Sequence, residues 1–178
     1  MSLEILIGNR IPRDFFITKG KGESDITVHA GSYHLALKDA NIEMCNIMTY
    51  SSILPKIANE VPRPEKLVHG SVMETIMAVE NVEKGYRGTA GIVFGWIYDK
   101  KTQEKYGGLV CEYHGPLTEV EAGKELRESL NELYINGFND EFNLKDIQYV
   151  SQSIIPKKKF GTALVSLCFV NYVFPQIG

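Results

Sequence analysis

The stretch Ala90-Gly-Ile-Val-Phe-Gly-Trp-Ile-Tyr98 is followed by the polar segment DKKTQEKY and then by Gly107-Gly-Leu-Val-Cys-Glu-Tyr-His114. Both apolar runs are rich in β-branched and aromatic residues, and each has the length of a strand. The polar segment between them has the composition of a turn. We therefore predict an antiparallel hairpin, and the neighbouring elements are interpreted around it.

A helix is predicted directly after this hairpin. Thr118 is followed by Glu121 at the spacing of a capping box, which marks the start of a helix. Apolar side chains then recur at helical spacing until Gly137, at Val120, Leu126, Leu130, Leu133 and Tyr134. This pattern indicates a helix with one apolar face that packs against a sheet.

Strands predominate in the rest of the chain. The segment 19–31 (KGKGESDITVHAG) is rich in glycine and small polar residues, so we interpret it as a surface loop that precedes a short helix over 32–40. Further strands are predicted over 44–50, 70–79, 147–155 and 162–174, the last two separated by the basic turn PKKKFG. Strands thus outnumber helices, which favours a layered α+β sandwich over a doubly wound fold. Without a linker or a repeat, residues 1–178 are expected to form a single domain.

Composition and charge exclude several classes of partner. Apolar residues make up 44% of the 178 residues, and 19 Lys and Arg are set against 22 Asp and Glu, so no broad basic surface for nucleic acid is expected. The opening MSLEILIGNRIP lacks the cationic start of a secretion signal, and the longest apolar stretch, 164–174, is too short to cross a bilayer. Three separated cysteines, Cys45, Cys111 and Cys168, predict free thiols. We expect a cytoplasmic protein that binds neither nucleic acid nor membrane.

No metal site is predicted. Neither helical spacing nor a neighbouring cysteine or carboxylate pattern accompanies the four histidines, His29, His34, His69 and His114. The stretches GKG and GTAG lack both the P-loop ending and the dinucleotide-binding fingerprint, so we interpret them as turns. The lysines 157–159 are interpreted as a solvated turn.

Two stretches contain groups that could do chemistry. In Asn46-Ile-Met-Thr-Tyr-Ser-Ser-Ile-Leu-Pro-Lys56, two adjacent serines follow a predicted strand, and Pro55 makes the chain turn soon after. In the second strand of the hairpin, Glu112 interrupts an apolar run and shares a face with Val110, whereas Cys111 points the other way. From the residues alone, the serines form a turn. Glu112 lies either on an exposed sheet face or in a buried setting that suits proton transfer.

Four motifs, in order along the chain, resemble the pyruvoyl-dependent arginine decarboxylases of archaea and some bacteria. They are NIMTYSSILPK (46–56), HGSVMETIMA (69–78), GGLVCEYHG (107–115) and KKKFGTALVSLCFVNYVF (157–174). The resemblance implies a four-layer αββα sandwich with mainly antiparallel sheets. It also implies trimers, or dimers of trimers, with active sites between neighbouring subunits.

The same resemblance implies that the precursor, a zymogen, cuts its own backbone between Ser51 and Ser52. The products would be a β chain, residues 1–51, and an α chain, residues 52–178, and Ser52 would become a covalent pyruvoyl group. Such a group withdraws electrons from the carbon of a bound amino acid that loses carbon dioxide. The implied enzyme is a carboxy-lyase that converts L-arginine to agmatine and carbon dioxide. The reaction could serve polyamine biosynthesis, acid resistance or arginine consumption.

Site residues follow from the matching motif positions. Ser52 and Glu112 are expected to be catalytic, with Glu112 returning a proton to the substrate carbon after decarboxylation. Asn46 matches an asparagine that would orient the scissile peptide or the substrate. Without the motif, Asn46 would be interpreted as an ordinary polar residue of a strand.

Substrate binding is expected from His34, Leu37 and Ile53. Relatives place an acidic residue where this chain has His34, and a histidine does not supply the same fixed negative charge for a guanidinium. Nearby carboxylates could take over that role, namely Glu23, Asp25 and Asp39. Two alternatives therefore stay open: a pyruvoyl-dependent decarboxylase of another amino acid, and an oligomeric relative that never cuts itself.

Overall fold

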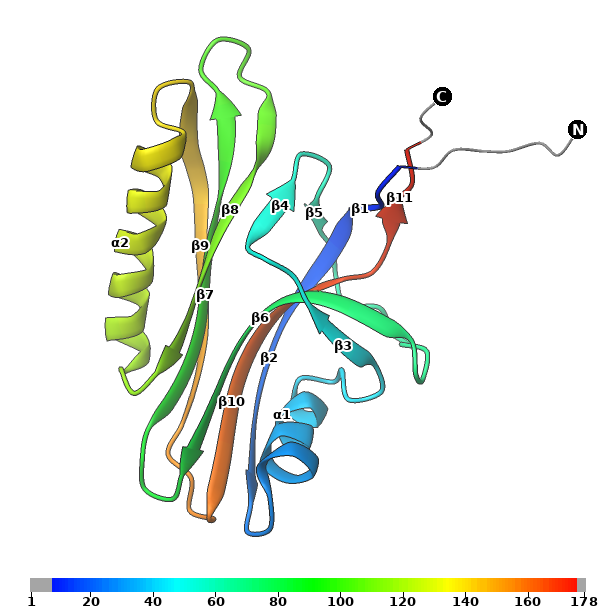
Figure 1. Cartoon of the computed structure of the whole chain (residues 1–178), viewed down its shortest axis with the longest axis vertical. Coiled ribbons are helices and arrows are strands. Elements are labelled where there is room, and N and C mark those ends of the chain that lie inside the picture. Colours follow the sequence, from blue (N-terminus) through cyan, green and yellow to red (C-terminus); the bar gives the residue numbers. More distant parts are fainter. Residues whose placement is uncertain (1–7, 176–178) are drawn as a thin grey trace, which may run out of the picture.

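The computed structural model describes residues 8–175, so most of the opening segment 1–12 and the last three residues lie outside the described part. Within residues 8–175 the strands form sheets of five, four and two strands (Figure 1). The five-stranded sheet has the order β3 (Asn46–Thr49), β6 (Val72–Glu83), β10 (Phe160–Phe169), β2 (Asp14–Ser24), β5 (Asn59–Glu60). The four-stranded sheet has the order β4 (Ile53–Pro55), β8 (Lys105–Gly115), β7 (Gly88–Asp99), β9 (Phe142–Ile154). A small sheet pairs β1 (Ile11–Pro12) with β11 (Tyr172–Val173).

Antiparallel pairing dominates these sheets. The two parallel pairs within the described residues are β3 with β6 and β2 with β5, and the other pairs are antiparallel. The described chain is 49% strand and 18% helix. The prediction of a mainly antiparallel, strand-rich protein with few helices is therefore confirmed.

The predicted hairpin is formed by β7 and β8. Its register pairs Gly91 with Tyr113 and Ile97 with Gly107, and β9 pairs with the other side of β7. Alternate residues of β7 face opposite ways, as the pleat requires. Phe94 lies in a core cluster shared with β2, β6 and β10, whereas Val93 lies in the cluster that packs against the long helix. One face of β7 thus packs against the five-stranded sheet, and its other face packs against the long helix.

The long helix α2 (Glu119–Gly137) begins with the predicted capping box. The Thr118 hydroxyl accepts a hydrogen bond from the Glu121 amide at 3.3 Å, and the Thr118 amide donates to the Glu121 carboxylate at 2.9 Å. The predicted apolar face is correct only in part, since Val120 is 83% exposed and Leu133 is 40% exposed. The buried face consists of small and apolar residues, namely Ala122, Gly123, Leu126 and Leu130.

The short helical segment follows a strand, not the predicted loop, and packs against the five-stranded sheet. A π-helical turn, η1 (Val28–Tyr33), leads into α1 (His34–Asp39), which confirms a helix within 32–40. The loop predicted over 19–31 is wrong for residues 19–24, which belong to β2. The reason is close packing: a Cβ on Gly20 would lie 2.2 Å from the Ala36 carbonyl oxygen, and one on Gly22 would lie 2.3 Å from the Ser32 carbonyl oxygen. These glycines are strand residues that let the helical segment approach the backbone.

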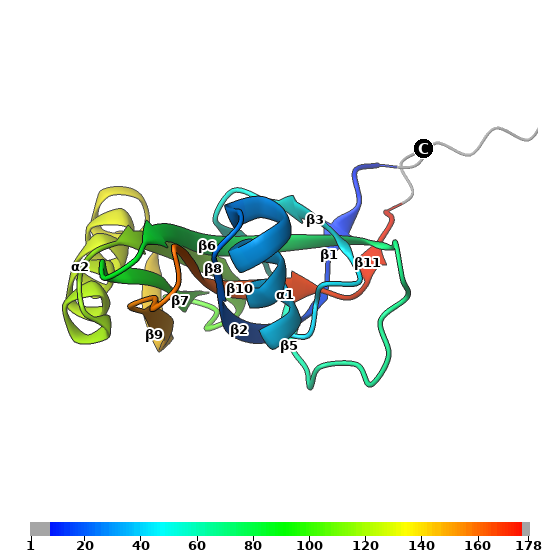
Figure 2. The same cartoon turned by 90° about the horizontal axis from the view of Figure 1, so that it is seen from below.

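The helices lie on different sides of the strands. Figure 2 shows α2 beside β7, β8 and β9, and α1 beside β2 and β10, which agrees with the contacts between these elements.

The strand predicted over 162–174 is divided into two strands. β10 ends at Phe169, and β11 leaves that sheet to pair with β1. Among residues 8–175, no helix combines the length and the apolar character that spanning a membrane requires.

We predict that Gly22→Ala lowers the free energy of unfolding by about 1–3 kcal/mol, because the new methyl group would overlap the backbone of η1 and α1. Thermal unfolding followed by circular dichroism would measure the change. The neighbouring Lys21 side chain is exposed, so Lys21→Ala is the matched control. Equal stability of the two variants would contradict the close packing of α1 on β2.

Candidate active site

The segment that contains the two serines passes from one sheet to the other. Residues 50–52 connect β3, in the five-stranded sheet, to β4, in the four-stranded sheet. On one side, the Tyr50 amide donates to the Thr75 carbonyl of β6 at 2.7 Å. On the other side, the Ser52 carbonyl accepts from the Val110 amide of β8 at 3.3 Å. The peptide between Ser51 and Ser52 is thus anchored by backbone hydrogen bonds to both sheets.

The Ser52 hydroxyl is bound to the Glu112 carboxylate. The Ser52 Oγ lies 2.6 Å from both Glu112 Oε1 and Glu112 Oε2, so the hydroxyl donates to either oxygen. Both residues are half-buried in the single subunit. Glu112 comes from β8, whose register with β4 pairs Ile53 with Leu109. The pairing of β4 with β8 therefore brings a serine and a carboxylate that are 60 residues apart into contact.

The carbonyl that precedes Ser52 also has a hydrogen-bond partner. The Ile53 amide donates to the Ser51 carbonyl oxygen at 2.9 Å, which closes a three-residue turn centred on Ser52. A backbone N–H directed at a carbonyl oxygen can stabilise negative charge that develops there. Sequence reasoning missed this contact, because no side chain marks it. The adjacent serines and Pro55 are local signals of a turn here, but they do not indicate which amide reaches the Ser51 carbonyl.

Asn46 does not contact the serines in this subunit. It is the first residue of β3, and its side-chain amide donates to the Gly70 carbonyl at 2.9 Å. A strand rises about 3.3 Å per residue, so the length of β3 separates Asn46 from the segment that contains Ser51. The structure therefore places Asn46 at the opposite end of β3 from the turn.

His34 and Leu37 also lie apart from Ser52. They line a pocket of about 420 Å³ together with His29, Ala30 and Tyr33. The rings of His29 and Tyr33 stack at 5.9 Å, and burial raises the pKa of the Tyr33 hydroxyl. Figure 1 shows α1 and β4 at well-separated levels of the subunit. Ile53, by contrast, follows Ser52 directly and is 68% exposed.

The carboxylates considered as substitutes for an acid at His34 already have partners. Asp39 accepts from the Lys21 amide at 2.9 Å. Glu23 accepts from the amides of residues 157 and 158 at 2.9 and 3.1 Å, and Asp25 accepts from the Lys159 amide at 3.1 Å. Glu23 and Asp25 thus bind the backbone of the basic turn between β9 and β10.

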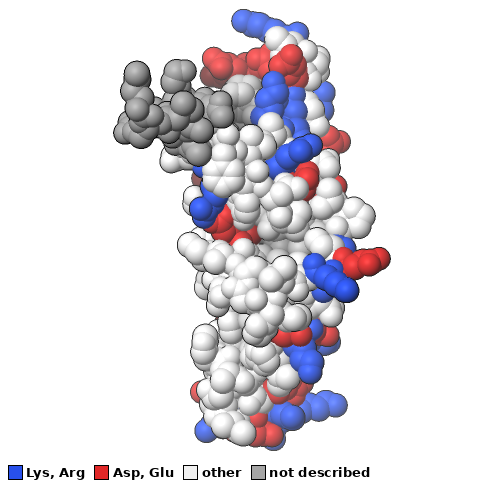
Figure 3. Space-filling view, turned by 90° about the vertical axis from the view of Figure 1, so that its right-hand side faces the viewer, with Lys and Arg blue, Asp and Glu red and all other residues white. Residues whose placement is uncertain are grey.

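An uncharged surface covers one side of the subunit. Figure 3 shows a wide area free of Lys, Arg, Asp and Glu on the side where Figure 1 places α1 and β3. Large apolar side chains are exposed on or next to these elements: Leu35, Met44, Met48 and Val72. The described part of the chain contains no group of three or more His, Cys, Asp or Glu that could bind a metal ion.

A serine hydroxyl bound to a carboxylate at a crossover between two sheets is compatible with a pyruvoyl enzyme, which builds its cofactor from its own backbone. Comparison with known families gives the same class. The model of the pyruvoyl-dependent arginine decarboxylases matches residues 14–174. The chain belongs to this family, and membership makes it a carboxy-lyase with a covalently bound pyruvoyl group as cofactor.

Similar proteins come from bacteria and archaea. The chain is 32% identical over 185 residues to pyruvoyl-dependent arginine decarboxylase AaxB of Chlamydia abortus, covering 93% of this chain and 94% of that protein. AaxB of Chlamydia muridarum is 33% identical over 187 residues, with the same coverage. Pyruvoyl-dependent arginine decarboxylase 2 of Methanosarcina mazei is 34% identical over 110 residues, covering 58% of this chain and 56% of that protein.

Proposed function

We propose that this chain cuts itself between Ser51 and Ser52 and then decarboxylates L-arginine to agmatine and carbon dioxide. The 2.6 Å contact between the Ser52 hydroxyl and the Glu112 carboxylate is the observation on which this proposal mainly rests. The names of the relatives specify arginine, which supports that substrate. The uncut chain is then a zymogen, and agmatine would feed polyamine synthesis.

The proposed cut begins at the Ser52 hydroxyl. Glu112 accepts the hydroxyl proton as Ser52 Oγ attacks the Ser51 carbonyl carbon, and the Ile53 amide stabilises the developing oxyanion. The peptide C–N bond then breaks as Glu112 passes the proton on to the Ser52 nitrogen, which leaves Ser51 esterified to Ser52 Oγ and Ser52 with a free amine. Loss of the Ser52 Cα proton expels the Ser51 carboxylate and leaves dehydroalanine. Addition of water and loss of ammonia convert dehydroalanine to the pyruvoyl group.

The same carboxylate serves the second reaction in this proposal. Once formed at position 52, the pyruvoyl group would supply an electron-withdrawing carbonyl for the substrate amine. Glu112, next to the former Ser52 side chain, then delivers a proton to the substrate carbon. Glu112 shares a face of β8 with Val110, which is 1% exposed, so the proton donor stands at the edge of the core.

We propose that residues 1–178 form one domain built as a four-layer αββα sandwich. Side chains of β2, β6 and β10 meet side chains of β7 and β8 in one core cluster, which supports two face-to-face sheets. The contacts of α1 with β2 and of α2 with β7 support helical outer layers. The cut would leave β1, β2 and β3 on the short chain, paired with strands of the long chain.

A homo-oligomer, a trimer or a dimer of trimers, completes the proposal. In the single subunit the pocket of His34 and Leu37 is far from Ser52, so a complete site needs a neighbouring copy to bring the two together. The uncharged surface supports contact between copies (Figure 3). The exposed apolar side chains of Leu35 on α1 and Met48 on β3 support it as well. Three free cysteines, Cys45, Cys111 and Cys168, support a reducing compartment such as the cytoplasm.

We predict that Ser52→Ala gives one unbroken chain under denaturing conditions, whereas the unmodified chain gives two fragments whose masses correspond to residues 1–51 and 52–178. The reason is that alanine lacks the attacking hydroxyl. Mass spectrometry of denatured protein would measure both, and a ketone reagent should label only the cut chain. Two fragments from the Ser52→Ala variant would show ordinary proteolysis instead.

We predict that Glu112→Gln still cuts itself, more slowly, but decarboxylates about 100- to 10,000-fold more slowly. Glutamine keeps an oxygen that accepts the Ser52 hydrogen bond but does not exchange a proton at neutral pH. The readouts are the rate of fragment formation and the kcat for carbon dioxide release. Full turnover by the cut variant would remove Glu112 from the decarboxylation step.

A decarboxylase of another amino acid remains the second candidate, because His34 lines the pocket where relatives place an acid. We predict that His34→Asp raises kcat/KM for arginine about tenfold, the equivalent of one charged hydrogen bond of about 1.5 kcal/mol. A screen of amino acids with both proteins would measure the preference. An unchanged substrate preference in the His34→Asp protein would show that His34 does not set the specificity. If the unmodified chain never cuts itself, the third hypothesis, an oligomeric relative without activity, is favoured.

A further inference from the structure

A buried carboxylate lies next to the segment that leads into the proposed cut. Glu74 is on β6, only 2% exposed, and faces the same side as Ile76, which belongs to the core cluster between the sheets. A charge in such a place is costly unless it has a partner. The motif HGSVMETIMA contains Glu74, but neither the proposed cut nor decarboxylation uses it.

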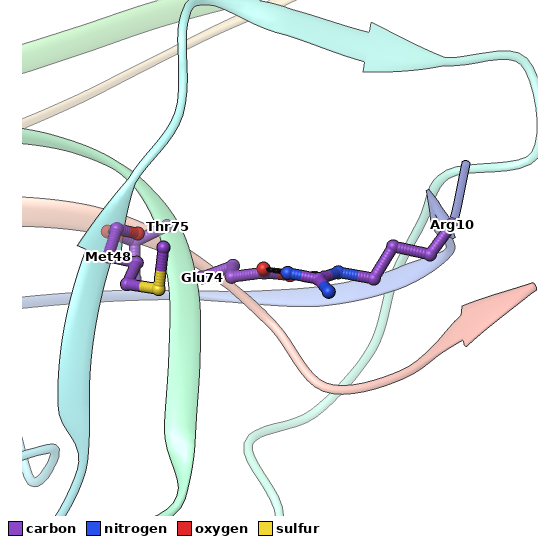
Figure 4. Close-up of polar contacts among 4 residues, drawn as sticks. All are labelled: Arg10, Met48, Glu74 and Thr75. Atoms are coloured by element: carbon purple, nitrogen blue, oxygen red, sulfur yellow. Dashed lines mark hydrogen bonds and ion pairs between the residues drawn. The ribbon is translucent and has the colours of Figure 1, made fainter.

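Arg10 is the partner of this carboxylate. Its Nη2 binds Glu74 Oε1, and its Nε donates to Glu74 Oε2 at 3.2 Å, so the guanidinium engages both oxygens (Figure 4). The two residues are 64 positions apart in the chain. Arg10 reaches Glu74 from the segment directly before β1 and is itself half exposed. The ion pair therefore attaches the segment before β1 to the face of β6 that points toward the other sheet.

The ion pair is next to the backbone that carries the cut. Glu74 is the register partner of Met48 on β3, and the next residue, Thr75, contacts the same segment twice. Its hydroxyl donates to the Met48 carbonyl at 3.4 Å, as Figure 4 shows, and its carbonyl accepts from the Tyr50 amide at 2.7 Å. Ser51 follows Tyr50 directly. The position of β6 at residues 74–75 thus determines where the Ser51 carbonyl lies.

Tyr172, near the end of the described chain, also contacts Arg10. The Arg10 guanidinium lies over the Tyr172 ring at 5.5 Å, and Tyr172 belongs to β11, which pairs with β1. Burial and the nearby Tyr50 together raise the pKa of the Tyr172 hydroxyl to about 12, and Arg10 acts in the opposite direction. Among the described residues, the Tyr172 hydroxyl is a buried side-chain group without a hydrogen-bond partner. Arg10 and Tyr172 therefore lie together, and Tyr50 lies close enough to Tyr172 to raise the pKa of its hydroxyl.

We propose that the Arg10–Glu74 ion pair is a positioning element for self-cleavage. The cut then depends on docking of the segment 8–10, which carries Arg10, against β6. A buried ion pair stabilises a fold little more than an apolar pair of similar size, but it permits one geometry. That geometry fixes β6 against Met48 and Tyr50. An undocked segment leaves Glu74 without its counterion, and the Ser51 carbonyl then loses its defined position relative to Ser52.

The test compares rates of self-cleavage and rests on the proposed function. Newly synthesised precursor is followed over time on denaturing gels for the unmodified chain, Arg10→Ala, Arg10→Lys and Glu74→Gln. We expect Arg10→Ala and Glu74→Gln to cut about 10- to 100-fold more slowly, because small misplacements of reacting atoms cost this much. Arg10→Lys should be intermediate, since lysine keeps the charge but not the two-pronged contact.

Two further measurements separate positioning from a general effect on the fold. Each substitution is also placed in the Ser52→Ala background, where thermal unfolding should show a folded protein at the assay temperature. Molecules that do become cut should have the kcat of the unmodified enzyme, because the ion pair acts on the cut alone. Arg13→Ala is the matched control, since Arg13 is exposed and only approaches Asp14 at 3.8 Å.

The outcomes are distinct. Cleavage of the Arg10 and Glu74 variants at the unmodified rate would overturn the inference, and so would unfolding of these variants in the Ser52→Ala background. An equal slowing by Arg13→Ala would also overturn it, because the effect would then be general to this segment. An unmodified chain that stays intact would instead refute the proposed function itself.

Discussion

The crossover at residues 50–52 is the constraint on which the rest of the site depends. A chain that leaves one sheet and joins another within a few residues must turn sharply, and here each side of the turn is bonded to a different sheet. Thr75 of β6 binds the residue before the serines, and Val110 of β8 binds Ser52. The Ser52 hydroxyl is thereby delivered to Glu112, while the Ser51 carbonyl receives the Ile53 amide. The bond from the Tyr50 amide to Thr75 also fixes the position of this turn relative to the five-stranded sheet.

The strand pairing also explains how a cut chain can keep its shape. β2 lies between β10 and β5, both of which would belong to the longer product of the proposed cut, and β3 pairs with β6. The hydrogen bonds of these pairs do not involve the peptide between Ser51 and Ser52. A break there therefore removes a covalent link at a turn, and the core contacts of Phe15 and Phe16 on β2 are unaffected.

Sequence patterns predicted the local elements and missed what packing decides. The hairpin and the cap of α2 follow from neighbours in the chain, so strand composition and the Thr118–Glu121 spacing were sufficient. Gly20 and Gly22 misled the prediction, because glycine in a strand and glycine in a loop look alike until the helix that lies on them is known. The Ser52–Glu112 contact was inferable only through resemblance. Arg10 and Glu74 gave no local signal, since 64 residues separate them.

The pairing of β1, β2 and β3 with later strands would prevent a cut chain from refolding after its two pieces separate. The 51-residue product would have no core of its own, because its apolar residues are buried against β6, β7 and β10. A precursor can fold with its segments tethered, whereas separated pieces must find each other in solution and insert a strand into the middle of a sheet. Denaturation of a chain cut at this position would therefore be effectively irreversible. Its durability is governed by how slowly it opens, a kinetic quantity, rather than by an equilibrium between folded and unfolded forms.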